Sequence, residues 1–501
     1  MNRPDLGQGA PDRAARRRML GPRVRDDRRG AGRPPLAVSA GSLMAARVAV
    51  AALGWGGTIL IARELGREAF GQFTLVFGLL GMLSIITDLG VGRVALRGMI
   101  GAGEDAARYA GSYVVLRACL GLVGYGVVLS FVTLSGYPAV VIQATAVAGL
   151  VVVLATPSHA YEVAFQATDR LTLLALASIV GQMAQLALTV ALVFGGGTLV
   201  WLTVPAVAKE ALVLLWKAPM AHRLVEFRYL IDRRIWGQLF REAVPLSLGT
   251  AMVTLYYRLD FVMLSKLDDF AAVGVYGVAY RFADVAHFVP SAVSVAILAS
   301  LVRAWPDDAD ECRTIIRRAA SLLAVVGGLV ITQVVVFAPD VLDLLYGNDY
   351  ATGAAAARIL ILGEGAAFLS SLAFACLVAT GRHRGYPIVT LTGLAVNVVL
   401  NIVLIPRYSF EGAAYATLVT EVLVAILMWR LVASIAPLRP LGLLPTAKVI
   451  PLAIVSGLVG LAVASVAPWL VGAAVTTGCY LALAHLARLA GPEGLRALVT
   501  S

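Results

Sequence analysis

The chain has 501 residues, of which 59% are apolar and only 14% are charged, and its formal net charge is +11. Soluble domains carry about 25% charged residues, so this composition excludes a water-exposed globule of this size. Much of the positive charge lies in residues 1–35, where ten arginines and four aspartates leave +6. This basic run belongs to a low-complexity tail, which argues against a nucleic-acid partner.

The tail is rich in arginine, glycine and proline and lacks apolar periodicity, so we expect residues 1–35 to be disordered. Apolar runs fill the rest of the chain, and a transmembrane helix needs about 20 mostly apolar residues. That length predicts fourteen spans, at 36–62, 70–96, 111–133, 138–165, 171–194, 198–217, 241–266, 272–302, 315–338, 355–380, 386–405, 411–435, 446–465 and 468–489. We therefore predict an all-α polytopic membrane protein.

The four cysteines are scattered along the chain and give neither a disulfide framework nor a metal-ligand spacing. They are Cys119, Cys312, Cys376 and Cys479. We expect neither a metal nor a cofactor.

The positions of lysine and arginine predict the orientation of the spans. With the N-terminus in the cytoplasm, the inner connectors and the C-terminal segment hold twenty-one Lys and Arg, whereas the outer connectors hold four. Cytoplasmic loops carry such an excess of positive charge. The prediction is a multi-pass protein of the cytoplasmic (inner) membrane with both termini in the cytoplasm.

The longest polar inner connector divides the chain into two blocks. Six spans precede this basic linker, residues 218–240, and eight follow it. Because six is even, both blocks enter the membrane from the same side, as parallel repeats do. We therefore predict two parallel six-helix lobes, 36–217 and 241–435, followed by two C-terminal helices in 446–489.

Six cations fall within the predicted spans: Arg47, Arg117, Lys209, Arg258, Arg281 and Arg358. Each would cost about 2.5–3.5 kcal/mol at the bilayer centre, so each must reach the interface, form an ion pair or face a wet cavity. Arg117 and Arg358 lie near span ends, and we expect both to extend to the interface.

The other four cations lie about eight or more residues from either span end, which corresponds to about 12 Å of helix. They are Arg47, Lys209, Arg258 and Arg281. Guanidinium groups bind the oxygens of a diphosphate or a uronate bidentately. Our hypothesis is that these cations line a positively charged cavity for an anionic head group. The alternative is ion pairing, because Arg281 and Asp284 share a helix face at i, i+3 spacing.

Acidic side chains within the spans are candidates for binding a coupling proton or sodium ion. They are Asp260, Asp284, Glu162 and Glu364, and His159, three residues from Glu162 on one helix face, is a candidate to join them. The alternative interpretation is that these carboxylates simply neutralise buried arginines. Asn397 and Asn401, four residues apart, are interpreted as interhelical hydrogen-bonding groups rather than substrate contacts.

Four sequence blocks in chain order carry a family resemblance. They are ARELGREAFG (62–71) with DLGVG (88–92), DFVML (260–264) with VGVYGVAYR (273–281), LYGNDY (345–350), and NVVLNIVLIP (397–406) with EGAAYAT (411–417). Together they resemble the polysaccharide-biosynthesis branch of the multidrug/oligosaccharidyl-lipid/polysaccharide exporters, over roughly residues 36–435.

The resemblance implies a flippase rather than an enzyme. Such a protein moves a polyprenyl-diphosphate-linked oligosaccharide across the cytoplasmic membrane by alternating access, for lipopolysaccharide, exopolysaccharide, capsule or cell-wall assembly. It also implies a monomer in contact with membrane lipid, with glycosyltransferases and a polymerase as partners.

Other functions remain open. Within the superfamily they are cation-coupled multidrug efflux and flipping of a peptidoglycan precursor. Drug-efflux proteins often carry a carboxylate on the first helix, where this chain has Arg47 and no acid. A membrane glycosyltransferase or a polysaccharide polymerase would need a site in an outer loop, and the longest outer connector, near 339–354, has about sixteen residues.

Overall fold

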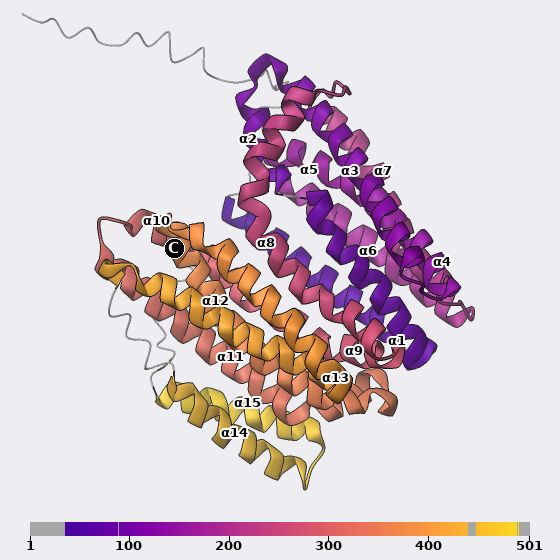
Figure 1. Cartoon of the computed structure of the whole chain (residues 1–501). Helices are drawn as coiled ribbons and strands as arrows, with labels where there is room; N and C mark the ends of the chain where they lie inside the picture. Colours follow the sequence, from indigo (N-terminus) through magenta and orange to yellow (C-terminus); the bar gives the residue numbers. More distant parts are fainter. Residues whose placement is uncertain (1–35, 89, 439–446, 488, 490–501) are drawn as a thin grey trace, which may run out of the picture.

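The computed structural model describes residues 36–88, 90–438, 447–487 and 489 (Figure 1). The predicted tail 1–35 lies outside the described residues, as do the side chains of residues 36–48. The described part of the chain is helical and contains no strand. In chain order the α-helices are α1 (Leu36–Asp88), α2 (Val91–Gly101), α3 (Ala106–Leu134), α4 (Ala139–Ala148), α5 (Leu150–Ala167), α6 (Leu171–Phe194), α7 (Val204–Leu224), α8 (Arg233–Leu267), α9 (Phe270–Ala286), α10 (Phe288–Ala304), α11 (Ala309–Tyr346), α12 (Ala354–Ala379), α13 (Tyr386–Ala433), α14 (Val449–Ala464) and α15 (Trp469–Leu486).

The fourteen predicted spans correspond to these helices. Nine helical stretches in the described residues are long and apolar enough to cross a membrane. Two of them, α1 and α13, each hold two spans, because the backbone leaves the helical conformation at Gly66 (φ 70°) and Ser409 (φ 53°). Helices α7, α8 and α14 are not among those nine and account for the three remaining predicted spans. The predicted all-α polytopic fold is confirmed.

One predicted span is too long. The sequence predicts a span over 70–96, but α1 ends at Asp88 and Gly90 adopts a left-handed conformation with φ 67°. Only glycine adopts this conformation readily, so the chain turns there. Residues 91–101 form the separate helix α2 instead.

Large apolar side chains cover the outer surface of the helices. Leu215 on α7 is 73% exposed, and Val399 and Ile402 on α13 are also exposed. Contiguous apolar surface of this kind is unfavourable in water and suits a lipid environment.

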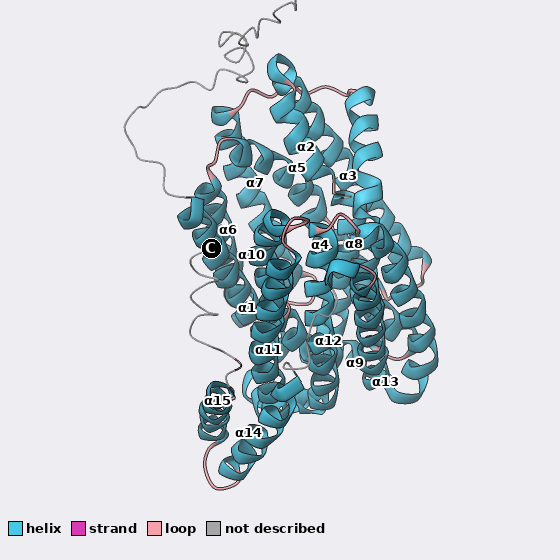
Figure 2. Cartoon of the chain, turned by 90° about the vertical axis from the view of Figure 1, so that its left-hand side faces the viewer, coloured by secondary structure: helices cyan, strands magenta, loops and turns pink. Residues whose placement is uncertain are grey.

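The helices form two halves, which we call the N-half (α1–α7) and the C-half (α8–α13). In the N-half, α1 packs against α6, and α5 packs against α3 and α7; in the C-half, α12 packs against α11 and α13. Helices α14 and α15 form a hairpin against α11 (Figures 1 and 2). The Tyr480 hydroxyl of this hairpin donates to the Val325 carbonyl oxygen at 2.9 Å.

The two halves meet closely at one end, where α1 turns at Gly66 and where α8 turns into α9. We call it the hairpin end after these two turns, and the name does not refer to the α14–α15 hairpin. A Cβ added at Gly71 would stand 1.7 Å from the carbonyl oxygen of Phe270, and one at Gly274 would stand 2.3 Å from that of Arg67. Only glycine permits such an approach of α1 to α9. The Trp55 indole nitrogen also donates to the Tyr346 hydroxyl across the halves at 2.6 Å.

The opposite end, which we call the linker end, carries residues 225–232 between α7 and α8. The first turns of α8 pack on the N-half there, and the Trp236 indole nitrogen donates to the Ser112 carbonyl oxygen on α3 at 3.1 Å. Farther along, α8 packs against α13. Figure 1 shows α8 running from the α2 end of the molecule to α9, so a single helix links the two halves.

Candidate functional site

A cavity of about 290 Å³ lies between the two halves and is lined by α1, α6, α8 and α9. We call it the inter-half pocket. Its charged wall belongs to the C-half and consists of Arg258, Arg281 and Asp284, whereas α6 of the N-half contributes Gln182 and Gln185. The structure thus brings together Arg258 and Arg281, two of the cations that the sequence places deep in the membrane.

The two arginines share a single carboxylate. A terminal nitrogen of Arg258 lies 3.8 Å from one oxygen of Asp284, and one of Arg281 lies 3.5 Å from the other oxygen. The three side chains are 35%, 37% and 30% exposed. Only the 3.5 Å contact of Arg281 is a hydrogen bond, and a long one, and each guanidinium has five donors, so most of these donors have no hydrogen-bond partner among the described residues. The site has two positive charges against one negative charge.

Of the two remaining predicted cavity cations, only Lys209 has a described side chain, and it lies elsewhere. Lys209 on α7 pairs with Glu210, with 3.3 Å between nitrogen and oxygen, and it does not line the inter-half pocket. Its placement follows the ion-pair alternative instead. The side chain of Arg47 lies outside the described residues, so its role in the cavity stays a prediction.

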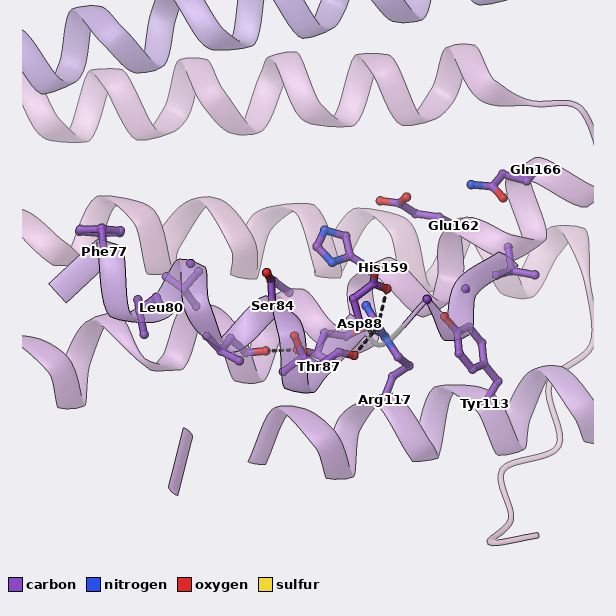
Figure 3. Close-up of a pocket in the computed structure, with 18 residues that line it drawn as sticks. Phe77, Leu80, Ser84, Thr87, Asp88, Tyr113, Arg117, His159, Glu162 and Gln166 are labelled. Carbon is purple, nitrogen blue, oxygen red and sulfur yellow. Dashed lines mark hydrogen bonds and ion pairs between the residues drawn. The ribbon is translucent and has the colours of Figure 1, made fainter. Parts of the chain in front are cut away.

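A second cavity, of about 610 Å³, lies within the N-half and is lined by α1, α2, α3 and α5. We call it the N-half vestibule. Figure 3 shows it extending from Phe77 past Asp88 and His159 to Gln166. Phe77 and Gly81 line both cavities, so the two adjoin along α1. Sequence reasoning missed this cavity, although it paired His159 with Glu162, three residues apart on one helix face.

Arg117 lies in the wall of the vestibule and corrects one expectation. Its side chain is only 3% exposed, pairs with Asp88 at 3.0 Å, and donates to the carbonyl oxygens of Thr87 and Thr156. The expectation that it extends to the membrane interface is therefore wrong, because backbone carbonyls of two other helices satisfy it inside the half. Arg358 also donates inward, to the Val335 carbonyl oxygen at 2.8 Å.

Glu162, one of the four predicted coupling acids, forms an ion pair with Lys217. The nitrogen and oxygen are 2.7 Å apart, and the side chains are 30% and 4% exposed, respectively. Asp284 is likewise occupied by Arg258 and Arg281. Both carboxylates thus have cationic partners.

Asp260 has a different environment. The residue is fully buried in the C-half and accepts hydrogen bonds from the Tyr276 hydroxyl at 2.8 Å, the Thr417 hydroxyl at 2.7 Å and the Asn401 amide at 2.8 Å. Among the described residues, it forms no ion pair. Asn401 bridges α13 to α8 in this way, and it also donates to the Asn397 side-chain oxygen at 3.0 Å.

Glu364 lies in a second buried group in the C-half. Its carboxylate is 3.3 Å from a ring nitrogen of His287, and its side chain is 7% exposed. Nearby on α13, the buried Glu421 accepts from the Tyr256 hydroxyl at 2.9 Å. This group contains no arginine or lysine pair among the described residues.

Comparisons with known proteins bear on the whole scaffold. Residues 36–302 match the family described as polysaccharide biosynthesis protein, and residues 245–403 match the family described as MatE. No curated protein matches the sequence.

Solved structures give a likeness in fold. The structure of lipid II flippase MurJ in an inward closed conformation has 12% sequence identity and a TM-score of 0.72, and the match covers 89% of this chain and 98% of that one. An inward-facing multidrug resistance MATE family transporter of the MOP superfamily has 16% identity and a TM-score of 0.66, covering 77% and 94%. A MOP superfamily transporter from Pyrococcus furiosus has 15% identity and a TM-score of 0.56, covering 81% and 95%.

Proposed function

The chain belongs to the polysaccharide biosynthesis protein family, and on that premise we propose that it flips a polyprenyl-diphosphate-linked oligosaccharide across the cytoplasmic membrane by alternating access of its two halves. The observation that carries the proposal is the pair of arginines in the inter-half pocket. The substrate serves the assembly of a cell-surface polysaccharide, built by glycosyltransferases and consumed by a polymerase.

The charge of the pocket suits a diphosphate. Two guanidinium groups against one carboxylate leave an excess positive charge, and both arginines line the cavity. Phosphate oxygens accept bidentate, charge-assisted hydrogen bonds from guanidinium. Asp284 holds both arginines in place, and an incoming diphosphate competes with it for their donors.

The contacts between the halves support alternating access. The glycine contact between α1 and α9 and the Trp55–Tyr346 hydrogen bond lie at the hairpin end. Lysine and arginine placement puts the linker end in the cytoplasm. The structure then corresponds to a state in which the halves are joined on the outer side of the membrane, and transport requires these contacts to open.

We assign ion coupling to the C-half, at Asp260 and Glu364. Glu162 and Asp284 each have a permanent cation beside them, so binding a further proton or sodium ion there would have to displace a salt bridge. Asp260 is surrounded by neutral hydroxyl and amide groups, and the oxygens of the two hydroxyls and of the carboxylate are ligands that hard cations prefer. Buried carboxylates without an arginine or lysine partner are the groups that protonate or bind an ion most readily.

The test is export by arginine variants. Arg258→Gln and Arg281→Gln remove one charge each, and we expect each to reduce export at least about tenfold, because charge-assisted hydrogen bonds contribute about 1.5–3 kcal/mol. Arg358→Gln removes a cation outside both cavities and is the matched control. Accumulation of lipid-linked oligosaccharide in the inner leaflet is measured beside the amount of protein in the membrane. Normal export by both pocket variants would refute the proposal.

Drug efflux is the second candidate, because residues 245–403 match the MatE family. A deletion strain distinguishes the candidates. Trapped lipid-linked oligosaccharide supports the flippase, whereas unchanged lipid intermediates with increased sensitivity to cationic drugs support efflux. A trapped peptidoglycan precursor would instead indicate the substrate handled by MurJ, whose fold the chain shares.

A further inference from the structure

We propose that the N-half vestibule binds the sugars next to the diphosphate and selects neutral or amino sugars over uronic acids. The inference rests on the proposed flippase function, because it takes the inter-half pocket as the diphosphate site. It adds a second subsite with a chemistry of its own.

The two cavities are adjacent. Phe77 and Gly81 on α1 line both of them, and a Cβ added at Gly81 would stand 3.6 Å from the side-chain nitrogen Nε of Arg258. A head group whose phosphate contacts Arg258 therefore has its first sugar at Gly81. The vestibule beyond is the larger cavity, about 610 Å³ against about 290 Å³. This order matches a diphosphate followed by several sugars.

The ion pairs of the vestibule are arranged so that the anion faces the cavity. Arg117 is 3% exposed and its partner Asp88 is 63% exposed, while Lys217 is 4% exposed and its partner Glu162 is 30% exposed. Both cations are buried behind their carboxylates. The pairs are neutral overall, but a ligand in the vestibule meets carboxylate oxygens.

Both buried cations donate to groups of the chain itself. Arg117 donates to Asp88 and to the carbonyl oxygens of Thr87 and Thr156, and Lys217 donates to Glu162. Because both side chains are at most 4% exposed, they offer little contact to an anionic ligand in the vestibule. The inter-half pocket differs, since its guanidinium groups are as exposed as their carboxylate.

Carboxylates that face a cavity recognise hydroxyl and amino groups. An ionised carboxylate only accepts hydrogen bonds, so it binds the hydroxyls of a sugar or the nitrogen of an amino sugar. A uronate would bring a like charge against Asp88 and Glu162, and like charges placed together reject a ligand. Ser84, Gln166 and the imidazole of His159 line the same cavity and add uncharged polar groups (Figure 3).

The test measures binding to the purified full chain in lipid vesicles. The probes are undecaprenyl diphosphate alone and the same carrier bearing N-acetylglucosamine, glucosamine or glucuronic acid. For the unmodified chain we expect the N-acetylglucosamine and glucosamine carriers to bind at least tenfold more tightly than the glucuronic acid carrier.

Variants locate this selectivity. The double variant Glu162→Gln/Lys217→Met removes an ion pair without leaving a buried charge, and we expect it to reduce the selectivity to about threefold or less while carrier diphosphate binds as before. Gln166→Ala, which alters no charge, should weaken binding of the N-acetylglucosamine and glucosamine probes without strengthening binding of the glucuronic acid probe. The control Asp310→Asn/Arg313→Met removes a pair on α11 and should leave the selectivity unchanged.

The outcomes separate the two proposals. If undecaprenyl diphosphate alone does not bind, or if Arg258→Gln does not weaken it, the proposed function fails. If the carrier binds through Arg258 but the glucuronic acid probe binds as tightly as the others, the vestibule proposal alone is overturned. Selectivity that survives the Glu162→Gln/Lys217→Met change also overturns it.

Discussion

The close contact between Gly71 and Phe270 makes Gly71→Ala a sharp test of alternating access. A Cβ at this position would stand 1.7 Å from the Phe270 carbonyl oxygen, whereas real Cβ contacts essentially never fall below 3.0 Å. The backbones of α1 and α9 must therefore separate by about 1.3 Å, the difference of these two distances. No flexible side chain can move aside, because the clashing atom belongs to the backbone.

The separation disfavours only the state in which the hairpin end is joined. Overpacking a well-packed contact costs about 1–3 kcal/mol, and 1.4 kcal/mol is a factor of ten in an equilibrium constant. We expect Gly71→Ala to lower the ratio of joined to separated molecules by about tenfold and to slow export. Gly126→Ala, on α3 with no atom near its added Cβ, is the matched control.

Cross-linking across the hairpin end measures this ratio. Arg67 and Asp349 form an ion pair of 3.6 Å between the halves, with side chains 38% and 79% exposed. Cysteines at these two positions report the joined state through the rate of reaction with a short thiol cross-linker. A wild-type cross-linking rate in the Gly71→Ala background would refute the reasoning, and so would a slower rate in the Gly126→Ala control.

Three further changes test other parts of the molecule. Asp260→Asn keeps the size of a buried side chain but removes its charge, so transport should lose its dependence on pH or sodium; unchanged ion dependence would exclude Asp260 as the coupling group. Asp232 caps α8; desolvation opposes ionisation, but donors from Ile235, Arg108 and Arg234 together lower its pKa. The ionised Asp232 carboxylate therefore stabilises the fold above pH 3.8, its ordinary pKa, and this stabilisation is lost as the pH falls through the lower pKa of the folded state. Thermal melts of Asp232→Asn should lack this decrease in stability at acid pH. Tyr480→Phe removes the hydroxyl that donates to the Val325 carbonyl oxygen, so the α14–α15 hairpin should lose about 1 kcal/mol against α11, seen as faster proteolysis of that hairpin.

The positions of the spans could be predicted from the sequence because the bilayer requires a run of about 20 apolar residues for each crossing. The exception was the end of α1, where Gly90 turns the chain inside a run that remains apolar. Apolar composition indicates which residues can lie in lipid, but the left-handed conformation of Gly90 determines where α1 ends.

The candidate site was predictable only in part. Arg258 and Arg281 flank one short connector at similar distances, so their proximity followed from helix geometry. The burial of Arg117 did not, because two of its partners are carbonyl oxygens of Thr87 and Thr156, and every residue has a carbonyl. Which member of an ion pair is buried depends on the packing of other helices and leaves no pattern in the sequence.

The arrangement of α8 supplies the physical link between the proposed ion site and the substrate pocket. Asp260 and Arg258 are two residues apart, so they face nearly opposite sides of the helix: Asp260 toward Tyr276 and Asn401 in the C-half, and Arg258 toward the inter-half pocket. A change of charge at Asp260 therefore alters the packing of the same helical turn that positions Arg258.

This link makes a prediction about energetic coupling. If the ion site acts on the pocket through this turn, Asp260→Asn should change the affinity for undecaprenyl diphosphate in the unmodified chain but not in the Arg258→Gln background. The free-energy effects of two substitutions are non-additive when the two sites contact each other through one element, whereas the effects of substitutions at independent sites are additive. Asp310→Asn on α11, combined with Arg258→Gln, is the control and should be additive. Equal effects of Asp260→Asn in both backgrounds would show that the ion site and the pocket act independently, and the route through α8 would have to be abandoned.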